Sequence, residues 1–109
     1  MVIDEVPRAR RYQVAFAIRY RQRKQRRWQN GLTQNVSATG VLFGEAAREA
    51  RLQLDASLEM ELTIPSDLPG GVATRIFCSG RVARIVDAGI VDWPRIVAAT
   101  IAKYRLGRA

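Results

Sequence analysis

The sequence predicts an all-β fold, a small antiparallel barrel or sandwich built from five or six short strands. Apolar residues recur at every second position in several segments, which is the period of a half-buried strand. Clusters of glycine, proline, asparagine and aspartate separate these segments. The 109 residues, 48% of them hydrophobic, suffice for one domain whose core needs no disulfide or metal.

The first half of the chain predicts three strands. Apolar residues alternate with small or basic ones over positions 14–21, which indicates the first strand. Asn30-Gly31 follows, and this dipeptide is the strongest two-residue signal for a hairpin turn. We therefore expect a second strand over residues 32–36 and a third beyond Gly40, where a bulge or bend is expected.

The second half predicts three more strands. The alternation breaks over residues 44–57, and within this range we expect residues 45–51 to form a short helix or an ordered loop. The proline- and glycine-rich segment 65–71 predicts a turn, and Gly80 inside an apolar run predicts a bulge. The strands expected in this half cover residues 58–64, 75–85 and 96–104.

The charge is concentrated in one segment. The net charge is +8, yet residues 8–27 hold nine arginines and lysines and no acid, while the rest carries nine bases and ten acids. Such a field favours an anionic partner, such as a nucleotide, a nucleic acid or an acidic lipid. The alternative is a charged strand edge that blocks aggregation. We expect a flexible arginine-rich leader over residues 1–12 and the barrel domain over 13–109.

The composition argues against catalysis. The chain has no histidine and a single cysteine, which removes the commonest general base and excludes zinc sites. Cys78 lies in an apolar strand and is interpreted as an inert core thiol. Asp87 and Asp92 flank a turn and are interpreted as solvated loop acids. We therefore expect a binding protein and not an enzyme, without catalytic residues, metal or cofactor.

The sequence also predicts the compartment. Residues 1–7 carry two acids and no apolar run, which is unlike a secretory signal. No segment approaches the roughly 18 apolar residues of a membrane helix. A lone cysteine is typical of a reducing environment. We expect a cytoplasmic protein without a membrane span, and the sequence leaves its oligomeric state open.

Two short stretches carry the chemistry of a binding site. Arg8, Arg10 and Arg11 offer guanidinium groups that bind phosphate bidentately, bind the O6 and N7 edge of guanine, or stack on a purine. The segment Asn35-Val36-Ser37-Ala38-Thr39-Gly40 offers short polar side chains and a glycine that permits close approach. Together they indicate a site for a small phosphorylated purine ligand. The alternatives are that the three arginines form a solvated basic tail and that the segment from Asn35 to Gly40 is a purely structural turn.

The chain resembles a PilZ domain, the bacterial receptor module for the second messenger cyclic di-GMP. The family signature pairs an arginine-rich leader, often written RRxxR, with a [D/N]xSxxG segment near the second strand. Asn35, Ser37 and Gly40 match the second part in full. The resemblance covers nearly the whole chain. It implies a six-stranded antiparallel barrel of the split-barrel type, on which these three residues bind cyclic di-GMP.

The leader departs from the family pattern at one position. Aligning Ile18-Arg19-Tyr20 with the end of the family's first strand places Arg8 and Arg11 at the second and last arginine positions, and Pro7 at the first. The first and last arginines are those the family's ligand usually needs. The resemblance therefore implies Arg8, Arg10 and Arg11 as leader ligands, with one expected contact replaced by Pro7.

Three functions are consistent with the sequence. The first is a single-domain cyclic di-GMP receptor and adaptor that relays the signal to an unidentified downstream protein. The second is a PilZ-fold protein-interaction module that no longer binds the nucleotide. The third is a basic nucleic-acid-binding barrel that uses residues 19–27. Few aromatic residues lie near that stretch and it has no RNA-binding signature, so nucleic acid is the least favoured partner.

Overall fold

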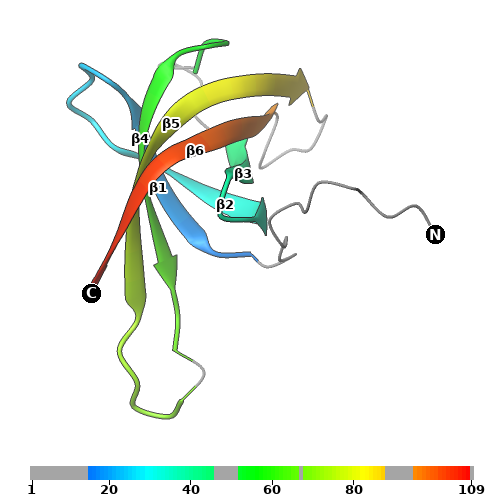
Figure 1. Ribbon diagram of the computed structural model, residues 1–109. Helices are drawn as coiled ribbons and strands as arrows, with labels where there is room; N and C mark the ends of the chain where they lie inside the picture. The colour runs from blue at the N-terminus through cyan, green and yellow to red at the C-terminus, as the bar shows by residue number, and fades with distance from the viewer. Residues whose placement is uncertain (1–14, 46–51, 67, 88–94, 109) are drawn as a thin grey trace, which may run out of the picture.

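The structure, a computed structural model, describes residues 15–45, 52–66, 68–87 and 95–108. These residues form one closed barrel of antiparallel strands in the order β1-β2-β3-β6-β5-β4 (Figure 1). The strands are β1 (Ala17–Gln22), β2 (Gln29–Val36), β3 (Gly40–Glu45), β4 (Ser57–Ile64), β5 (Thr74–Asp87) and β6 (Arg95–Arg108). The predicted all-β, six-stranded barrel is confirmed. Within the described ranges, no helix of the length and apolarity needed to cross a membrane is found.

Apolar residues that alternate along the strands fill the interior of the barrel. Ile18 and Tyr20 of β1 lie opposite Leu62 and Met60 of β4, and all four side chains are buried. The ring of Phe43 on β3 packs against Tyr20, with 4.8 Å between the ring centroids. Such tilted aromatic pairs stabilise a core beyond the area they bury. The period of two in the sequence therefore marks the residues that form the core.

The first hairpin turns earlier than predicted. The chain reverses between β1 and β2 through residues 23–28, where Lys24 has a φ of 83°. Asn30 and Gly31 lie inside β2, so the predicted turn at this dipeptide is wrong. Gly31 serves packing instead, because a Cβ there would lie 2.7 Å from the carbonyl oxygen of Gly44 and 3.2 Å from the Tyr20 ring.

The bulge predicted at Gly80 is confirmed. The register between β5 and β6 shifts between Ser79 and Gly80. A Cβ at position 80 would overlap the carbonyl oxygen of Thr100 on the neighbouring strand. The glycine therefore allows the two backbones to approach each other.

One end of the barrel is closed over a buried ion pair, and we call it the capped end. Glu45 is fully buried at the end of β3, and its Oε1 lies 2.9 Å from Nε of Arg95 at the start of β6. The backbone N–H of Leu52 donates to Glu45 Oε2, and the Leu52 carbonyl accepts from Arg95 Nη2. Of the helix or loop predicted over 45–51, Glu45 ends β3 and residues 46–51 lie outside the described residues.

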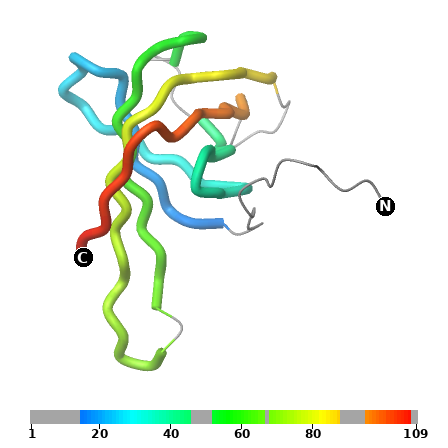
Figure 2. The backbone as a smooth tube through the Cα atoms, in the orientation of Figure 1, coloured from blue at the N-terminus to red at the C-terminus, as the bar shows by residue number. Residues whose placement is uncertain are grey.

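The other end, where β1 and β3 begin, is the open end. β4 and β5 continue beyond it as a long hairpin, and β6 follows β5 there, with Leu106 opposite Ile76 (Figure 2). The tip of this hairpin contains the turn predicted from its prolines and glycines. An apolar cavity of about 350 Å³ lies at this end, lined among others by Phe16, Ile64 and Tyr104.

Candidate ligand-binding groove

The Asn-x-Ser-x-x-Gly segment forms the turn that joins β2 to β3. The backbone N–H of Ser37 donates to the carbonyl of Gly40 at 2.8 Å. The Ser37 hydroxyl oxygen accepts from the N–H groups of Thr39 and Gly40 at 3.3 and 3.2 Å. A serine side chain at this position therefore stabilises the turn through its own backbone. The bend expected beside Gly40 is present, and the bulge of this hairpin lies between Thr33 and Asn35.

The three motif residues line one groove on the barrel. Its volume is about 220 Å³, and it lies where the turn meets β3, β5 and β6. Its lining consists of Asn35, Ser37, Thr39, Gly40, Val41, Leu42, Ala83, Arg84, Ala98, Ala99 and Thr100. Three alanines among these residues keep that part of the lining free of bulky side chains. The structure thus brings together the three residues that the sequence singled out in this segment.

The polar groups of the groove differ in how far they are already satisfied. No described residue gives the Asn35 side chain a hydrogen bond, so its amide is available to a ligand. The Thr100 hydroxyl accepts from the backbone N–H of Arg81 at 3.2 Å. A Cβ on Gly40 would lie 3.2 Å from the carbonyl oxygen of Ala99, which is tighter than ordinary contact. Gly40 therefore keeps β3 and β6 close beneath the groove.

Sequence reasoning missed Arg84, which supplies a positive charge to the groove from β5. It is exposed and has no ion pair or hydrogen bond with another described residue. Along β5 the buried Cys78, the partly buried Gly80 and the buried Val82 are two apart, but the next residue packed against the core, the partly buried Ile85, is three positions beyond Val82. This spacing accompanies a second register shift, between Val82 and Arg84. The interrupted alternation is the sequence signal that Arg84 faces outward.

The predicted leader ligands Arg8, Arg10 and Arg11 lie outside the described residues. The point at which the leader joins the barrel is described. The backbone N–H of Phe16 donates to the Thr33 hydroxyl at 2.7 Å, and the Thr33 N–H donates back to the Phe16 carbonyl. Phe16 also lines the apolar cavity of the open end together with Ser37 and Ala38. The first described residues of the chain therefore lie next to the motif turn.

Cys78 and Asp87, two of the residues considered for catalysis, do not line this groove. Cys78 is buried in the core, and burial raises the pKa of its thiol to about 11, so it is protonated at neutral pH. Asp87 is exposed at the end of β5, and Asp92 lies outside the described residues. In the described part of the chain, no three acidic, cysteine or histidine side chains gather into a candidate metal site.

Comparison with known proteins supports the fold. No model of a known protein family matches the sequence, and no curated protein matches it. The structure is similar to that of the inhibitor of motility (MotI/DgrA) of Bacillus subtilis, with a TM-score of 0.74 and 16% sequence identity. The match covers 94% of this chain and 45% of that one, so this chain spans less than half of its neighbour's length. At this identity the likeness concerns the fold alone.

Proposed function

We propose that this chain is a cyclic di-GMP receptor of the PilZ type that relays the second-messenger signal to a partner protein in the cytoplasm. The observation that carries the proposal is the single groove lined by Asn35, Ser37 and Gly40 beside the point where the leader enters. These are the family's motif residues, and they come from a segment of only six residues that spans the end of β2, the turn and the start of β3. The groove adds the amide of Asn35 and the guanidinium of Arg84, neither of which has a side-chain hydrogen bond or ion pair with another described residue.

The chemistry of the ligand fits these groups. Cyclic di-GMP carries two phosphates and two guanines, and a guanidinium binds either with paired hydrogen bonds. Arg84 supplies one guanidinium from the barrel, and Arg8, Arg10 and Arg11 supply three more from the leader. Arg11 lies five positions before Phe16 in the chain, and five extended residues span roughly 17 Å. The leader arginines therefore have the reach to close over a ligand in the groove.

The adaptor role is supported by the name of the structural neighbour. MotI/DgrA is named as an inhibitor of motility, which describes an effect on another cellular process. By analogy of fold, we propose that this chain also acts on another protein.

Isothermal titration calorimetry with cyclic di-GMP tests the proposal. We expect the full chain to bind with a Kd of roughly micromolar or below. Arg11→Ala, Asn35→Ala and Arg84→Ala each remove a ligand contact and should weaken binding about tenfold or more. Arg81→Ala is the matched control, because Arg81 is an exposed arginine of the same strand that does not line the groove. Absence of binding at millimolar ligand would contradict the proposal.

A specific observation favours a second function, a PilZ-fold interaction module without ligand. The Ser37 hydroxyl is already engaged by two backbone N–H groups of its own turn, so the motif serine has a structural role. Pro7 also replaces the first arginine of the family's leader. This function predicts an intact fold and no heat of binding when cyclic di-GMP is titrated into the protein. A protein partner should then bind equally well with and without the nucleotide.

A further inference from the structure

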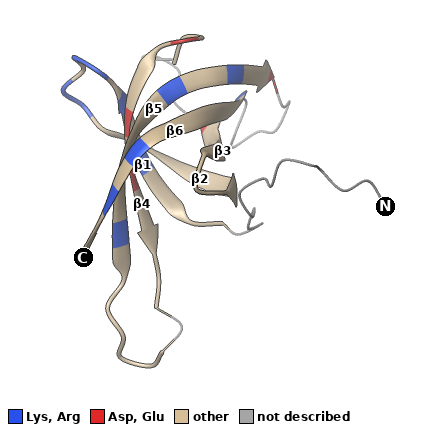
Figure 3. Ribbon diagram, viewed as in Figure 1, with Lys and Arg blue, Asp and Glu red and all other residues tan. Residues whose placement is uncertain are grey.

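The loop between β1 and β2 concentrates positive charge at the surface. Arg23, Lys24, Arg26 and Arg27 are all exposed, and no described residue gives any of these side chains an ion pair or a hydrogen bond. Figure 3 shows this loop projecting from the barrel as a nearly continuous basic segment. Crowded like charges repel one another and contribute nothing to closing the barrel. We call residues 23–27 the basic loop.

A broad groove begins beside the basic loop. Its volume is about 610 Å³, and residues of β1, β4, β5 and β6 line it. Trp28 lies at one side, with the guanidinium carbons of Arg21 and Arg19 at 4.4 and 5.0 Å from its ring. Phe77 lies on β5, with Arg105 at 4.5 Å from its ring. Stacking holds these planar cations in defined positions, and we call this surface the stacked groove.

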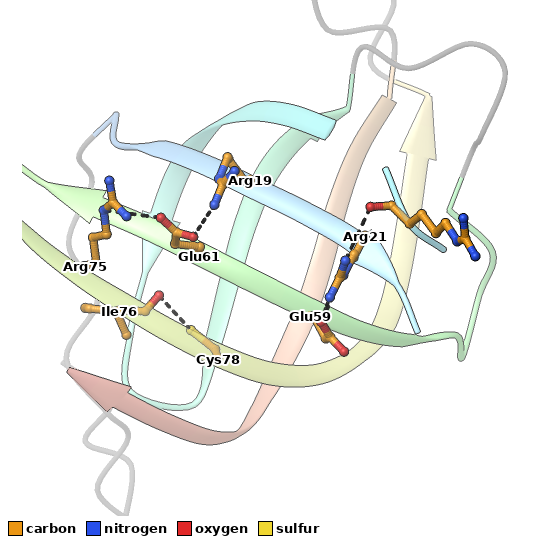
Figure 4. Close-up of polar contacts among 8 residues, drawn as sticks. Arg19, Arg21, Glu59, Glu61, Arg75, Ile76 and Cys78 are labelled. Carbon is orange, nitrogen blue, oxygen red and sulfur yellow. Dashed lines mark hydrogen bonds and ion pairs between the residues drawn. The ribbon is translucent and has the colours of Figure 1, made fainter. Parts of the chain in front are cut away.

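The carboxylates on β4 neutralise only part of the charge of the stacked groove. Glu59 accepts from Arg21 at 2.8 Å, and Glu61 lies 2.5 Å from Arg19 and 3.4 Å from Arg75 (Figure 4). The cations of the groove and its rim are Arg19, Arg21, Arg75, Lys103 and Arg105. With five cations and two carboxylates, the groove and its rim carry a net charge of +3. Among the described residues, Lys103 and Arg105 have no carboxylate partner.

We propose that the basic loop and the stacked groove form the docking surface for the partner protein, and that the partner presents an acidic polypeptide segment there. Charge complementarity identifies the occupant, since the four cations of the loop and the excess of three in the groove require carboxylates opposite them. Tryptophan and arginine are the residues enriched at the energetic centres of protein interfaces. This inference rests on the proposed adaptor role and names the surface through which it acts.

A polypeptide fits this surface better than a nucleic acid does. Single-stranded nucleic acids bind by stacking their bases on aromatic rings. Here Trp28 and Phe77 are already engaged by guanidinium groups of the chain itself. A phosphate backbone of uniform charge would also have to pass Glu59 and Glu61, whereas a polypeptide of mixed charge can meet both signs. The acidic partner is therefore a protein.

The inference is tested by selecting, from a displayed library of random 16-residue peptides, those that bind the full chain. We expect the selected peptides to carry an excess of aspartate and glutamate. Their affinity should fall about tenfold in Arg26→Glu, on the loop, and in Lys103→Glu, in the groove. Arg81→Glu is the matched control, since it makes the same charge change at an exposed arginine outside this surface and should leave binding unchanged.

Three results of the selection would overturn the inference: selected peptides without an acidic excess, selected peptides that bind the two variants as well as the unaltered chain, or no enrichment. Tighter binding of a 16-nucleotide single-stranded DNA than of the peptides would overturn it in favour of a nucleic acid. Calorimetry with cyclic di-GMP on the same variants separates the two proposals. Arg26→Glu should bind the nucleotide as tightly as the unaltered chain while it binds the peptide about tenfold more weakly. Peptide binding without nucleotide binding would contradict only the proposed receptor function.

Discussion

Single residues in this barrel are constrained by how closely neighbouring backbones approach. Gly31 faces the carbonyl of Gly44, and Gly80 faces that of Thr100, so neither position has room for a Cβ. Ser37 is constrained differently, because its hydroxyl holds the turn that shapes the candidate ligand groove. A residue's role here is therefore set by the strand beside it as much as by its own propensity.

Replacing Gly80 with alanine should destabilise the barrel strongly. The added Cβ would overlap the Thr100 carbonyl, and backbone cannot move aside as a flexible side chain does. We expect Gly80→Ala to lower the free energy of unfolding by about 3 kcal/mol, measured by urea denaturation. Ser79→Ala, at the exposed neighbouring position, should change it by less than about 0.5 kcal/mol. Equal stability of the two variants would show that the β5–β6 bulge adapts.

Neighbouring strands are joined by ion pairs in two different environments. The Glu45–Arg95 pair joins β3 to β6 at the capped end, where the exposed fractions of the two side chains are 0% and 10%. The Glu61 pairs join β4 to β1 and β5, where Arg19 and Arg75 keep 46% and 42% of their side chains exposed. Water can solvate these two arginines when their partner is lost, but it does not reach Arg95 to the same extent.

The same substitution should therefore have different costs at the two glutamates. Glu45→Gln leaves a buried guanidinium without its counter-charge and should cost about 3 to 5 kcal/mol of unfolding free energy. Glu61→Gln should cost about 1 kcal/mol or less. Salt provides the control in the same denaturation experiment. Added salt should reduce the cost of Glu61→Gln, where the arginines are half exposed, and leave the cost of the buried Glu45→Gln nearly unchanged. Similar costs at both positions would contradict this assignment of the buried pair.

The sequence predicted the strands better than their connections. Alternating burial is a local signal, so the core residues of β1 and β4 followed from the period of two. The turn at Asn30-Gly31 was wrong because the glycine is needed for close packing against β3, which a local motif does not reveal. Glu45 was also missed, since its partner lies fifty residues away and the β3–β6 register joins them. Non-local pairings of this kind cannot be read from one sequence.

At the scale of the whole molecule, the candidate ligand groove and the candidate docking surface lie on different parts of the barrel. The motif groove lies where the β2–β3 turn meets β3, β5 and β6, and the stacked groove lies over β1, β4, β5 and β6. The two share no lining residue.

The sequence indicated the motif residues because they are adjacent in the chain. It did not indicate Arg84 or the stacked groove, which the barrel assembles from distant strands. The leader is the remaining part, and we predict that it contributes to binding and not to folding.

Removing residues 2–12 should therefore leave the barrel folded and abolish ligand binding. β1 remains anchored without them, through the paired hydrogen bonds of Phe16 and Thr33 and the full β1–β4 register. We expect the unfolding free energy without ligand to change by less than about 1 kcal/mol. With cyclic di-GMP at a hundred times its Kd, the full chain should gain about 2.7 kcal/mol, and the shortened chain should gain nothing. Thermal unfolding with and without the nucleotide measures both quantities.

A chain in which Arg8, Arg10 and Arg11 are all lysine provides the control for charge. It keeps the length and net charge of the leader but loses the planar fork that binds phosphate and guanine with paired hydrogen bonds. We expect this variant to behave like the shortened chain, because lysine supplies only a point charge. Full ligand stabilisation in the lysine variant would show that charge alone holds the nucleotide. Full stabilisation in the shortened chain would contradict the role of the leader and confine the site to Asn35, Ser37, Gly40 and Arg84.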